Sequence, residues 1–324
     1  MTRAALRCAE LVGDDVVGII GGWAGLLERN LRPITFEDFE DVIGTGGTLL
    51  STSRTNPMKE PDGLNRIRAN MAAEHIDALI AVGGDDTLGV AAALAATGTK
   101  VIGVPKTIDN DLAGTDYSFG FFSAVDEAMR LSESLGTTGR SHGRVMVVEI
   151  MGRDAGWIAA YAGIAAGANM ILVPEFETDL EDVVRVVKSR AERHKSGSLI
   201  VVAEGVKLGY GGTTEKDAFG HALLAKAQGE SNAAFLARYI EERTGMDTRA
   251  TVLGHTIRGT APDAYDRIVS TKLGFRAMEL AHAGKFGVMV ALRGTEVVDV
   301  PLSEGSKKKY LDKGTWDLAR HLFV

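Results

Sequence analysis

The sequence predicts an α/β protein with mostly parallel sheets flanked by helices, and three observations carry this prediction. Short apolar runs rich in β-branched residues recur along the chain, with segments of helical spacing between many of them. These runs are apolar at consecutive positions, which is typical of strands that helices cover on both faces. At 324 residues the chain is also long enough for about two domains of roughly 150 residues each.

The individual elements follow this alternation in order. A helix with one apolar side is predicted at 2–11, and the first strand at 16–20. Later strands are predicted at 78–82, 101–104, 145–150, 170–173, 199–203, 251–253 and 287–292. The helices predicted between them lie at 87–96, 121–134, 179–194 and 233–243.

Three further segments need separate interpretation. Residues 156–174 carry no charge over the length of a membrane span, but they are mostly alanine and glycine, so we interpret them as a buried helix leading into a buried strand. Residues 208–220 are polar and rich in glycine, which predicts a surface loop or hairpin. The basic run at 306–309 is expected to be a solvated loop.

Composition narrows the class of protein. Lys and Arg number 36 and Asp and Glu 43, so the net charge is −7. This balance argues against a nucleic-acid binder, which needs a basic face, but it permits an anionic substrate held by local arginines. The single cysteine excludes an intramolecular disulfide and a cysteine-based zinc site. Because the first residues lack the apolar segment of a signal peptide, we expect a cytoplasmic protein without membrane attachment.

The first constellation with chemical meaning is Gly83-Gly84-Asp85-Asp86-Thr87, between the strand at 78–82 and the helix that follows. Glycines and a helix N-terminus suit a phosphate, whereas two carboxylates would repel one. A hard cation such as Mg²⁺ resolves this conflict, because it binds one or two carboxylates together with phosphate oxygens. The alternative is a plain turn in which the two aspartates cap the helix.

The second constellation, Pro105 to Asp111 (P-K-T-I-D-N-D), follows the strand at 101–104. One helix and one strand separate it from the first, so the two strands should be parallel neighbours with both constellations at their carboxyl ends. Ligands bind at this end of such sheets. A carboxylate beside a metal and a lysine could accept the proton of a substrate hydroxyl.

Arginines and one histidine at later strand ends indicate a sugar-phosphate site. Arginine presents paired donors that suit phosphate. Each arginine alone is better explained by a surface ion pair, but four of them at strand ends favour a sugar-phosphate clamp. Glu204 ends the strand at 199–203 and could accept hydrogen bonds from sugar hydroxyls. The basic candidates are Arg144, Arg153, Arg249, His255 and Arg258, with Arg54 as a weaker one.

Five segments, in order, resemble the phosphofructokinase family over nearly the whole chain: G-G-D-D-T, P-K-T-I-D-N-D, M-G-R-D-A-G-W, A-E-G and R-A-T-V-L-G-H-T-I-R-G. The resemblance implies two Rossmann-like lobes with the active site in the crevice between them. It implies Mg²⁺-dependent phosphoryl transfer to O1 of fructose 6-phosphate, a step of glycolysis, by a homodimer or homotetramer. The donor lobe would hold 1–120 and about 257–307, and the fructose 6-phosphate lobe 121–256 and about 308–324.

The resemblance also implies a role for individual residues. Asp109 resembles the catalytic base, Thr107 would contact the transferring phosphoryl group, and Asp85 would hold Mg²⁺ with Asp111 as an additional candidate. Arg54 resembles an arginine that bridges the donor and the transition state. The remaining candidates line the sugar-phosphate site or reach into the neighbouring subunit's site; they are Ile108, Met151, Gly152, Arg153, Glu204, His255, Thr256, Ile257 and Arg258, and the reaching pair Arg144 and Arg249.

Two residues bear on the phosphoryl donor. ATP-dependent members of the family typically have glycine at the position of Asp86, and often have glycine at the position of Lys106. The combination of Asp86 and Lys106 resembles the pyrophosphate-dependent branch. A carboxylate at Asp86 would repel the α-phosphate of ATP. Lys106 would give positive charge to the leaving group of pyrophosphate. The resemblance thus implies reversible transfer from pyrophosphate, with an ATP-dependent enzyme as the alternative.

The N-terminus departs from the family pattern. Members open with a strand and a G-G-D-x-P-G-L-N-type loop ahead of the helix predicted here at 2–11. We therefore expect the first strand and loop to be missing, through a misassigned start or a real truncation. Because that loop contacts donor phosphates, a non-catalytic sugar-phosphate-binding subunit is a further alternative.

Overall fold

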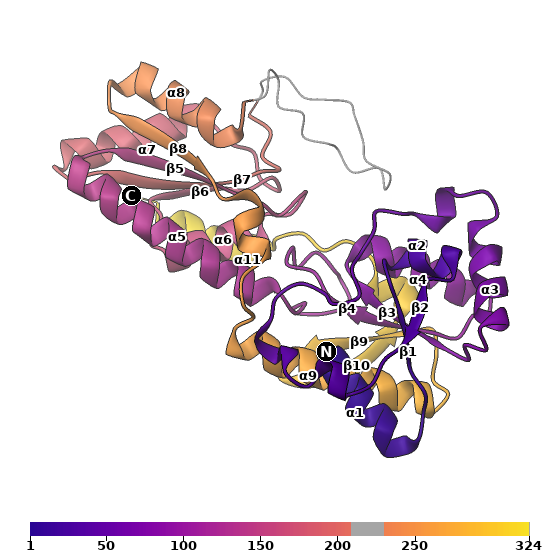
Figure 1. The fold of residues 1–324 in the computed structure, drawn as a ribbon. Helices are drawn as coiled ribbons and strands as arrows, with labels where there is room; N and C mark the ends of the chain where they lie inside the picture. The colour runs from indigo at the N-terminus through magenta and orange to yellow at the C-terminus, as the bar shows by residue number, and fades with distance from the viewer. Residues whose placement is uncertain (209–229, 324) are drawn as a thin grey trace.

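The computed structural model describes residues 1–208 and 230–323, which form two lobes that each contain a four-stranded sheet (Figure 1). An extra two-stranded antiparallel ribbon joins β1 (Val17–Ile19) to β2 (Leu31–Pro33) in the first lobe. The prediction of an α/β fold with mostly parallel sheets is therefore confirmed.

The sheet of the first lobe has the order β10-β9-β4-β3. Its strands are β3 (Leu79–Gly83), β4 (Val101–Pro105), β9 (Val288–Arg293) and β10 (Glu296–Pro301). The pairing of β3 with β4 is parallel and places Gly83 opposite Pro105, which confirms the predicted neighbours. Only β10 runs antiparallel to its neighbour, because it returns from β9 through a tight turn.

Helices cover this sheet and attach the N-terminal segment. Helix α4 makes the crossover from β3 to β4, and α1 packs along α9. The helices of this lobe are α1 (Thr2–Val12), α2 (Trp23–Glu28), α3 (Gly63–Ala73), α4 (Asp85–Ala96), α9 (Ala264–His282) and α10 (Leu302–Gly305).

The sheet of the second lobe has the order β6-β7-β5-β8, with all strands parallel. Every residue of β5, β6 and β7 is buried, as continuous apolar runs predict for doubly covered strands. The strands are β5 (Val145–Ile150), β6 (Met170–Leu172), β7 (Ser198–Ala203) and β8 (Thr248–Val252). The helices are α5 (Phe121–His142), α6 (Trp157–Ala165), α7 (Leu180–Glu192), α8 (Asn232–Thr244) and α11 (Lys313–His321).

Several predicted elements are confirmed and others are corrected. The segment 156–174 forms α6 and then β6, and among the described residues no helix has the length and apolar character to cross a membrane. The predicted end of the helix at 134 is wrong, because α5 continues to His142. The predicted start of a strand at 251 is also wrong, because β8 begins at Thr248. The loop or hairpin predicted at 208–220 lies, apart from Leu208, outside the described residues.

The run at 306–309 is not simply a solvated loop. Leu112 and Lys308 form an antiparallel bridge, the Lys309 N–H donates to the Asp111 carbonyl at 2.7 Å, and the Ala113 N–H donates to the Lys307 carbonyl at 2.8 Å. Lys307 stays exposed, whereas the half-buried Lys309 side chain bends toward the loop, where its Nζ donates to the Asp116 carbonyl.

The lobe boundaries near 120, 256 and 307 stay a proposal, and the packing supports them. Helix α11 contacts α6 and β6, and Leu311 and Trp316 belong to the apolar core of the second lobe. Helix α9 contacts β4 and β9 of the first lobe. The chain would thus cross between the lobes at each of these boundaries.

Candidate functional site

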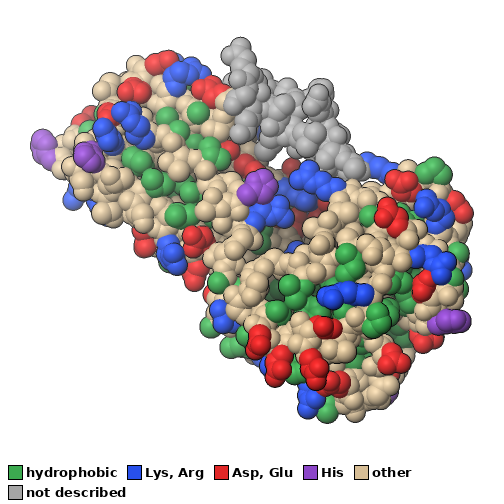
Figure 2. Space-filling view, viewed as in Figure 1, with side chains coloured by type: hydrophobic (Ala, Val, Ile, Leu, Met, Phe, Trp, Pro, Cys, Tyr) green, Lys and Arg blue, Asp and Glu red, His purple; other side chains and the backbone are tan. Residues whose placement is uncertain are grey.

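Acidic and basic side chains from both lobes meet at the carboxyl ends of three strands. Asp85 and Asp86 follow β3, Thr107 and Asp109 follow β4, and Arg153 follows β5. Figure 2 shows basic side chains and one histidine gathered where the lobes meet, with acidic side chains deeper in the hollow. The convergence predicted from strand order is confirmed for the two segments of the first lobe.

The turn between β3 and α4 depends on its glycines. A Cβ atom at Gly84 would lie 3.3 Å from the Cβ of Thr107, so a larger residue would press the turn away from the loop after β4. Asp85 and Asp86 then occupy the first turn of α4, where the helix field favours negative charge. Their side chains are only 11% and 19% exposed and face Arg153.

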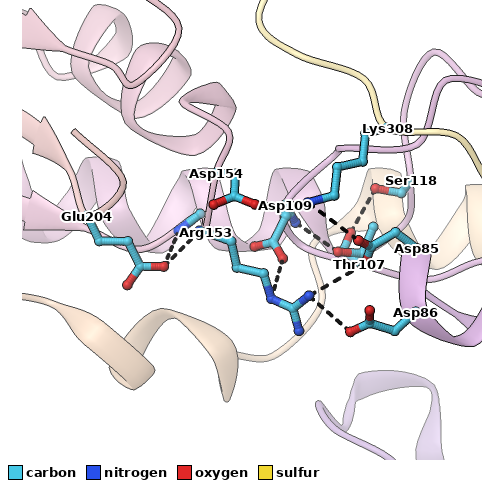
Figure 3. Close-up of polar contacts among 10 residues, drawn as sticks. Asp85, Asp86, Thr107, Asp109, Ser118, Arg153, Asp154, Glu204 and Lys308 are labelled. Carbon is cyan, nitrogen blue, oxygen red and sulfur yellow. Dashed lines mark hydrogen bonds and ion pairs between the residues drawn. The ribbon is translucent and has the colours of Figure 1, made fainter. Parts of the chain in front are cut away.

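Arg153 reaches from the second lobe into this group of carboxylates (Figure 3). Its Nη1 lies 3.2 Å from Asp86 Oδ2 and 3.5 Å from Asp85 Oδ1, and its Nε lies 3.8 Å from Asp109 Oδ2. Burial alone would lower the pKa of Arg153, but the three carboxylates outweigh burial and raise it. One guanidinium thus balances three acidic groups that would otherwise repel one another.

Asp109 is buried at the centre of this arrangement. Its N–H donates to Thr107 Oγ1 at 3.1 Å, which closes the turn after β4. Burial raises the pKa of Asp109, while Arg153 and Arg258 oppose that rise. Burial, Asp109 and Asp85 together raise the pKa of Asp111 to about 7. The loop therefore holds two carboxyl groups that bind protons more readily than exposed aspartates.

The next residue, Asn110, fixes the shape of the loop. Its backbone adopts the left-handed conformation with φ of 52°, and its Oδ1 accepts the Ser118 N–H at 3.1 Å. The Ser118 hydroxyl in turn donates to the Thr107 carbonyl at 2.8 Å. These bonds orient Asp109 toward the crevice.

Glu204 organises the segment that carries Arg153. Its Oε1 accepts the N–H of Gly152 at 3.1 Å and the N–H of Arg153 at 2.7 Å. Arg153 itself has φ of 53°, a conformation that needs such support. Met151 is half-buried beside this turn. Glu204 therefore shapes the turn, in addition to any bond that it makes to a ligand.

The short 3-10 helix Gly254–Arg258 places further candidates at the lobe junction. His255, Thr256 and Arg258 are exposed, whereas the Ile257 side chain is fully buried in the core, so only its backbone can face a ligand. Lys106 lies at the edge of the crevice. Loss of water contact in the crevice and the charge of Arg258 lower the pKa of Lys106, and Asp109 opposes that shift.

The structure does not bring Arg144, Arg249 and Arg54 into this group. Arg144 and Arg249 both pair with Asp247, at the amino ends of β5 and β8, which is the opposite end of the sheet from Arg153. Arg54 is exposed in an irregular segment, and no hydrogen bond or ion pair links it to another residue in the described ranges. Ile108 is half-buried and packs against the core of the second lobe.

Sequence reasoning missed Lys308. Its Nζ donates to Asp154 Oδ2 at 2.8 Å and lies 4.0 Å from Asp85 Oδ2, as Figure 3 shows. Burial would lower the pKa of Lys308, but the bond to Asp154 and the charge of Asp85 raise it. The lysine run was visible in the sequence, but its pairing with 111–113 is a long-range contact that no local pattern reveals.

Asp85 fits the donor set of a substrate-bridged Mg²⁺. Within 1–208 and 230–323 no group of three His, Cys, Asp or Glu residues could hold a metal by itself. Mg²⁺ needs fewer protein ligands than that, since it keeps waters and binds one or two carboxylates with phosphate oxygens. A mostly buried carboxylate that faces the crevice meets this requirement.

Comparison with known proteins yields consistent similarities. The phosphofructokinase family pattern matches residues 1–281. The chain is 51% identical over 309 residues to the pyrophosphate–fructose 6-phosphate 1-phosphotransferase of Amycolatopsis methanolica, covering 94% of this chain and 89% of that protein. It is 42% identical to the ATP-dependent 6-phosphofructokinase of Mycobacterium bovis, covering 99% and 94%.

Among solved structures, the Pichia pastoris phosphofructokinase in the T-state matches with a TM-score of 0.82 at 26% identity. The match covers 99% of this chain but only 34% of the yeast chain, so the present chain spans about a third of that protein. The structural match to the yeast protein includes both lobes of this chain.

Proposed function

The chain belongs to the phosphofructokinase family, and on that premise we propose that it transfers a phosphoryl group from pyrophosphate to O1 of fructose 6-phosphate. The products are fructose 1,6-bisphosphate and phosphate, and the reaction runs in both directions. The observation that carries the choice of donor is Asp86, which stands beside Asp85 in the crevice and contacts Arg153.

Asp109 acts as the general base of the forward reaction. It accepts the proton of the 1-hydroxyl while the hydroxyl oxygen bonds to one phosphorus of pyrophosphate. The bond from that phosphorus to the bridging oxygen breaks, which releases phosphate. The buried position and raised pKa of Asp109 support this role, because a base works best when its pKa lies near the working pH.

Cationic groups around the crevice stabilise the charge that develops on the phosphoryl oxygens. Arg153 and Lys106 supply positive charge from opposite lobes, and the Thr107 hydroxyl contacts the transferring group. Asp85 would hold Mg²⁺, which neutralises charge on the donor phosphates when bound.

The second lobe binds the sugar phosphate. Glu204 contacts sugar hydroxyls beside Met151 and Gly152, and His255 and Arg258 bind the 6-phosphate, with Thr256 and the backbone of Ile257 alongside. Arg144 and Arg249 lie away from the crevice of their own chain, which supports a role at the site of a neighbouring subunit in a homodimer or homotetramer. Arg54 bridges donor and transition state only if its exposed segment closes over the crevice. A cytoplasmic location is part of the same proposal.

ATP is the second candidate donor, because a relative at 42% identity is named an ATP-dependent 6-phosphofructokinase. Asp86 argues against it. A carboxylate at that place repels the α-phosphate of ATP, and like charges a few ångströms apart in a poorly solvated crevice cost on the order of several kcal/mol.

The test is fructose 1,6-bisphosphate formation with pyrophosphate or ATP by the wild type and by Asp86→Gly. We expect the wild type to use pyrophosphate and Asp86→Gly to shift the ratio of kcat/KM values toward ATP by about tenfold or more. Glu10→Gly is the matched control, since Glu10 is exposed on α1 and, among the described residues, forms an ion pair only with Arg7. An unchanged donor ratio in Asp86→Gly would contradict the role of Asp86. No turnover with either donor would favour a sugar-phosphate-binding subunit.

A further inference from the structure

The segment after α10 lies directly beneath the loop that carries Asp109. Its backbone pairs with residues 111–113, which brings the half-buried Lys309 side chain next to that loop. The basic run is thus in contact with the candidate catalytic loop, although more than 190 residues separate the two in sequence.

Lys309 makes three hydrogen bonds to that loop. Its Nζ donates to Asn110 Oδ1 at 3.1 Å, to the Thr115 carbonyl at 3.0 Å and to the Asp116 carbonyl at 2.9 Å. The same ammonium lies 5.0 Å from the centre of the Trp157 ring. All three donors of the lysine are therefore used, and the aromatic face covers the charge on a further side.

These bonds act on the part of the loop that is strained. Asn110 has a left-handed backbone, which costs free energy and persists only where neighbours hold it. Its Oδ1 receives the Ser118 N–H from one side and the Lys309 ammonium from the other. Because Asn110 follows Asp109 directly, the conformation of Asn110 sets the direction of the Asp109 carboxylate.

We propose that Lys309 is a positioning residue for the reaction, which holds the turn at Asn110 so that Asp109 points at the reacting hydroxyl. Lys309 reaches neither the carboxylate group around Arg153 nor any residue proposed to bind the sugar, and it acts only through the loop. The expected effect on kcat rests on the proposed function, whereas the expected effect on the conformation of the loop does not.

The test compares Lys309→Met with Lys307→Met. The control removes a lysine of the same segment that, within 1–208 and 230–323, forms an ion pair only with the exposed Glu304. Hydrogen exchange of the backbone amides in 107–118, measured by mass spectrometry, should become about tenfold faster in Lys309→Met and stay unchanged in the control. This readout needs no turnover, so it remains decisive even if pyrophosphate is not the donor.

Steady-state kinetics distinguish a positioning role of Lys309 from a contribution to the stability of the fold alone. We expect kcat of Lys309→Met to fall about tenfold or more while KM for fructose 6-phosphate and for pyrophosphate changes by less than about threefold. A merely structural role would lower the melting temperature and leave kcat per folded molecule unchanged. If Lys309→Met does not fold, Lys309→Gln replaces it and should show the same two changes more weakly, because an amide offers two donors for the three acceptors and no charge. Unchanged exchange in 107–118, or an unchanged kcat in a folded variant, overturns the proposal.

Discussion

At the scale of single residues, the carboxyl group of Asp109 has the environment that its proposed role requires. It is buried, which favours the protonated form, and Arg153 and Arg258 restore part of the stability of the ionised form. The balance leaves a pKa above that of an ordinary aspartate. Asp111, with a pKa raised to about 7, shows how strongly this loop resists a second negative charge.

We expect Asp109→Asn to lower kcat by about 10²–10⁴-fold, the usual contribution of a general base. The base must be ionised, so the kcat of the wild type should fall as the pH drops through the pKa of Asp109. Because that pKa is raised, the fall should begin at a higher pH than for an exposed aspartate. Steady-state rates across pH check this, and Asp109→Asn should lose the limb that Asp109 causes.

Calorimetric titration with fructose 6-phosphate provides the control for Asp109→Asn, which should still bind the sugar phosphate. A variant that binds the sugar phosphate and keeps a rate close to wild type would show that another group accepts the proton.

At the scale of elements, the turns that form the site depend on close contacts between segments. A Cβ atom at Gly205 would lie only 2.2 Å from the Arg153 carbonyl oxygen. The glycine of the A-E-G segment thus lets the end of β7 approach the turn at 151–154. This contact is what brings Glu204 within hydrogen-bonding distance of the Gly152 and Arg153 N–H groups.

Gly205→Ala should therefore displace the turn that carries Arg153. We expect KM for fructose 6-phosphate to rise by about tenfold, and the melting temperature to fall, because backbone atoms cannot yield as a flexible side chain can. Gly89→Ala is the control, since a Cβ there meets nothing within 4 Å and lies inside α4. It should be neutral or stabilise the helix by up to about 1 kcal/mol. Equal KM values for the two variants would refute this account.

Local apolar patterns predicted most strands, whereas close packing between segments decided where some helices end. Strands β4, β5 and β7 are fully buried and mostly apolar, and β3 is an apolar run with alternate residues buried, so their patterns identify them locally. Helix α5 runs past the predicted end at 134, through Gly136 and Gly139, although glycine is unfavourable inside a helix. In fact a Cβ at Gly139 would lie 2.6 Å from Met146 Cγ, so that glycine serves close packing on β5.

The site was predictable where it follows strand ends and unpredictable where it depends on distant pairing. Asp85, Asp109 and Arg153 each follow a strand, and parallel strands bring such positions together. Lys308 reaches Asp85, and Lys309 reaches the loop that carries Asp109, only through the pairing of 306–309 with 111–113. Arg144 and Arg249 lie at the other end of their sheet, where one chain alone gives them no contact with the crevice.

At the scale of the whole molecule, a buried contact between the lobes lies beside the crevice. Asp266, at the start of α9, accepts the Ser123 N–H at 2.9 Å and its hydroxyl at 2.5 Å. The Asp263 N–H donates to the same Ser123 hydroxyl at 3.0 Å. Because Ser123 lies in the first turn of α5, this contact fixes the helix start from which the second lobe extends.

Arg153 of the second lobe forms ion pairs with Asp85 and Asp86 of the first lobe, and bound substrates would compete for these groups. Asp85 would hold the metal-bound donor in the first lobe, while the second lobe binds the sugar phosphate. Mg²⁺ with pyrophosphate should therefore stabilise the wild type by about 2.7 kcal/mol at a hundredfold excess over Kd, and chelation of Mg²⁺ should abolish this gain. Asp85→Asn should lose the same gain but keep the stabilisation by fructose 6-phosphate. Thermal unfolding with each ligand measures both effects. A variant that loses both would show that the two lobes do not bind independently, and one that loses neither would move the metal away from Asp85.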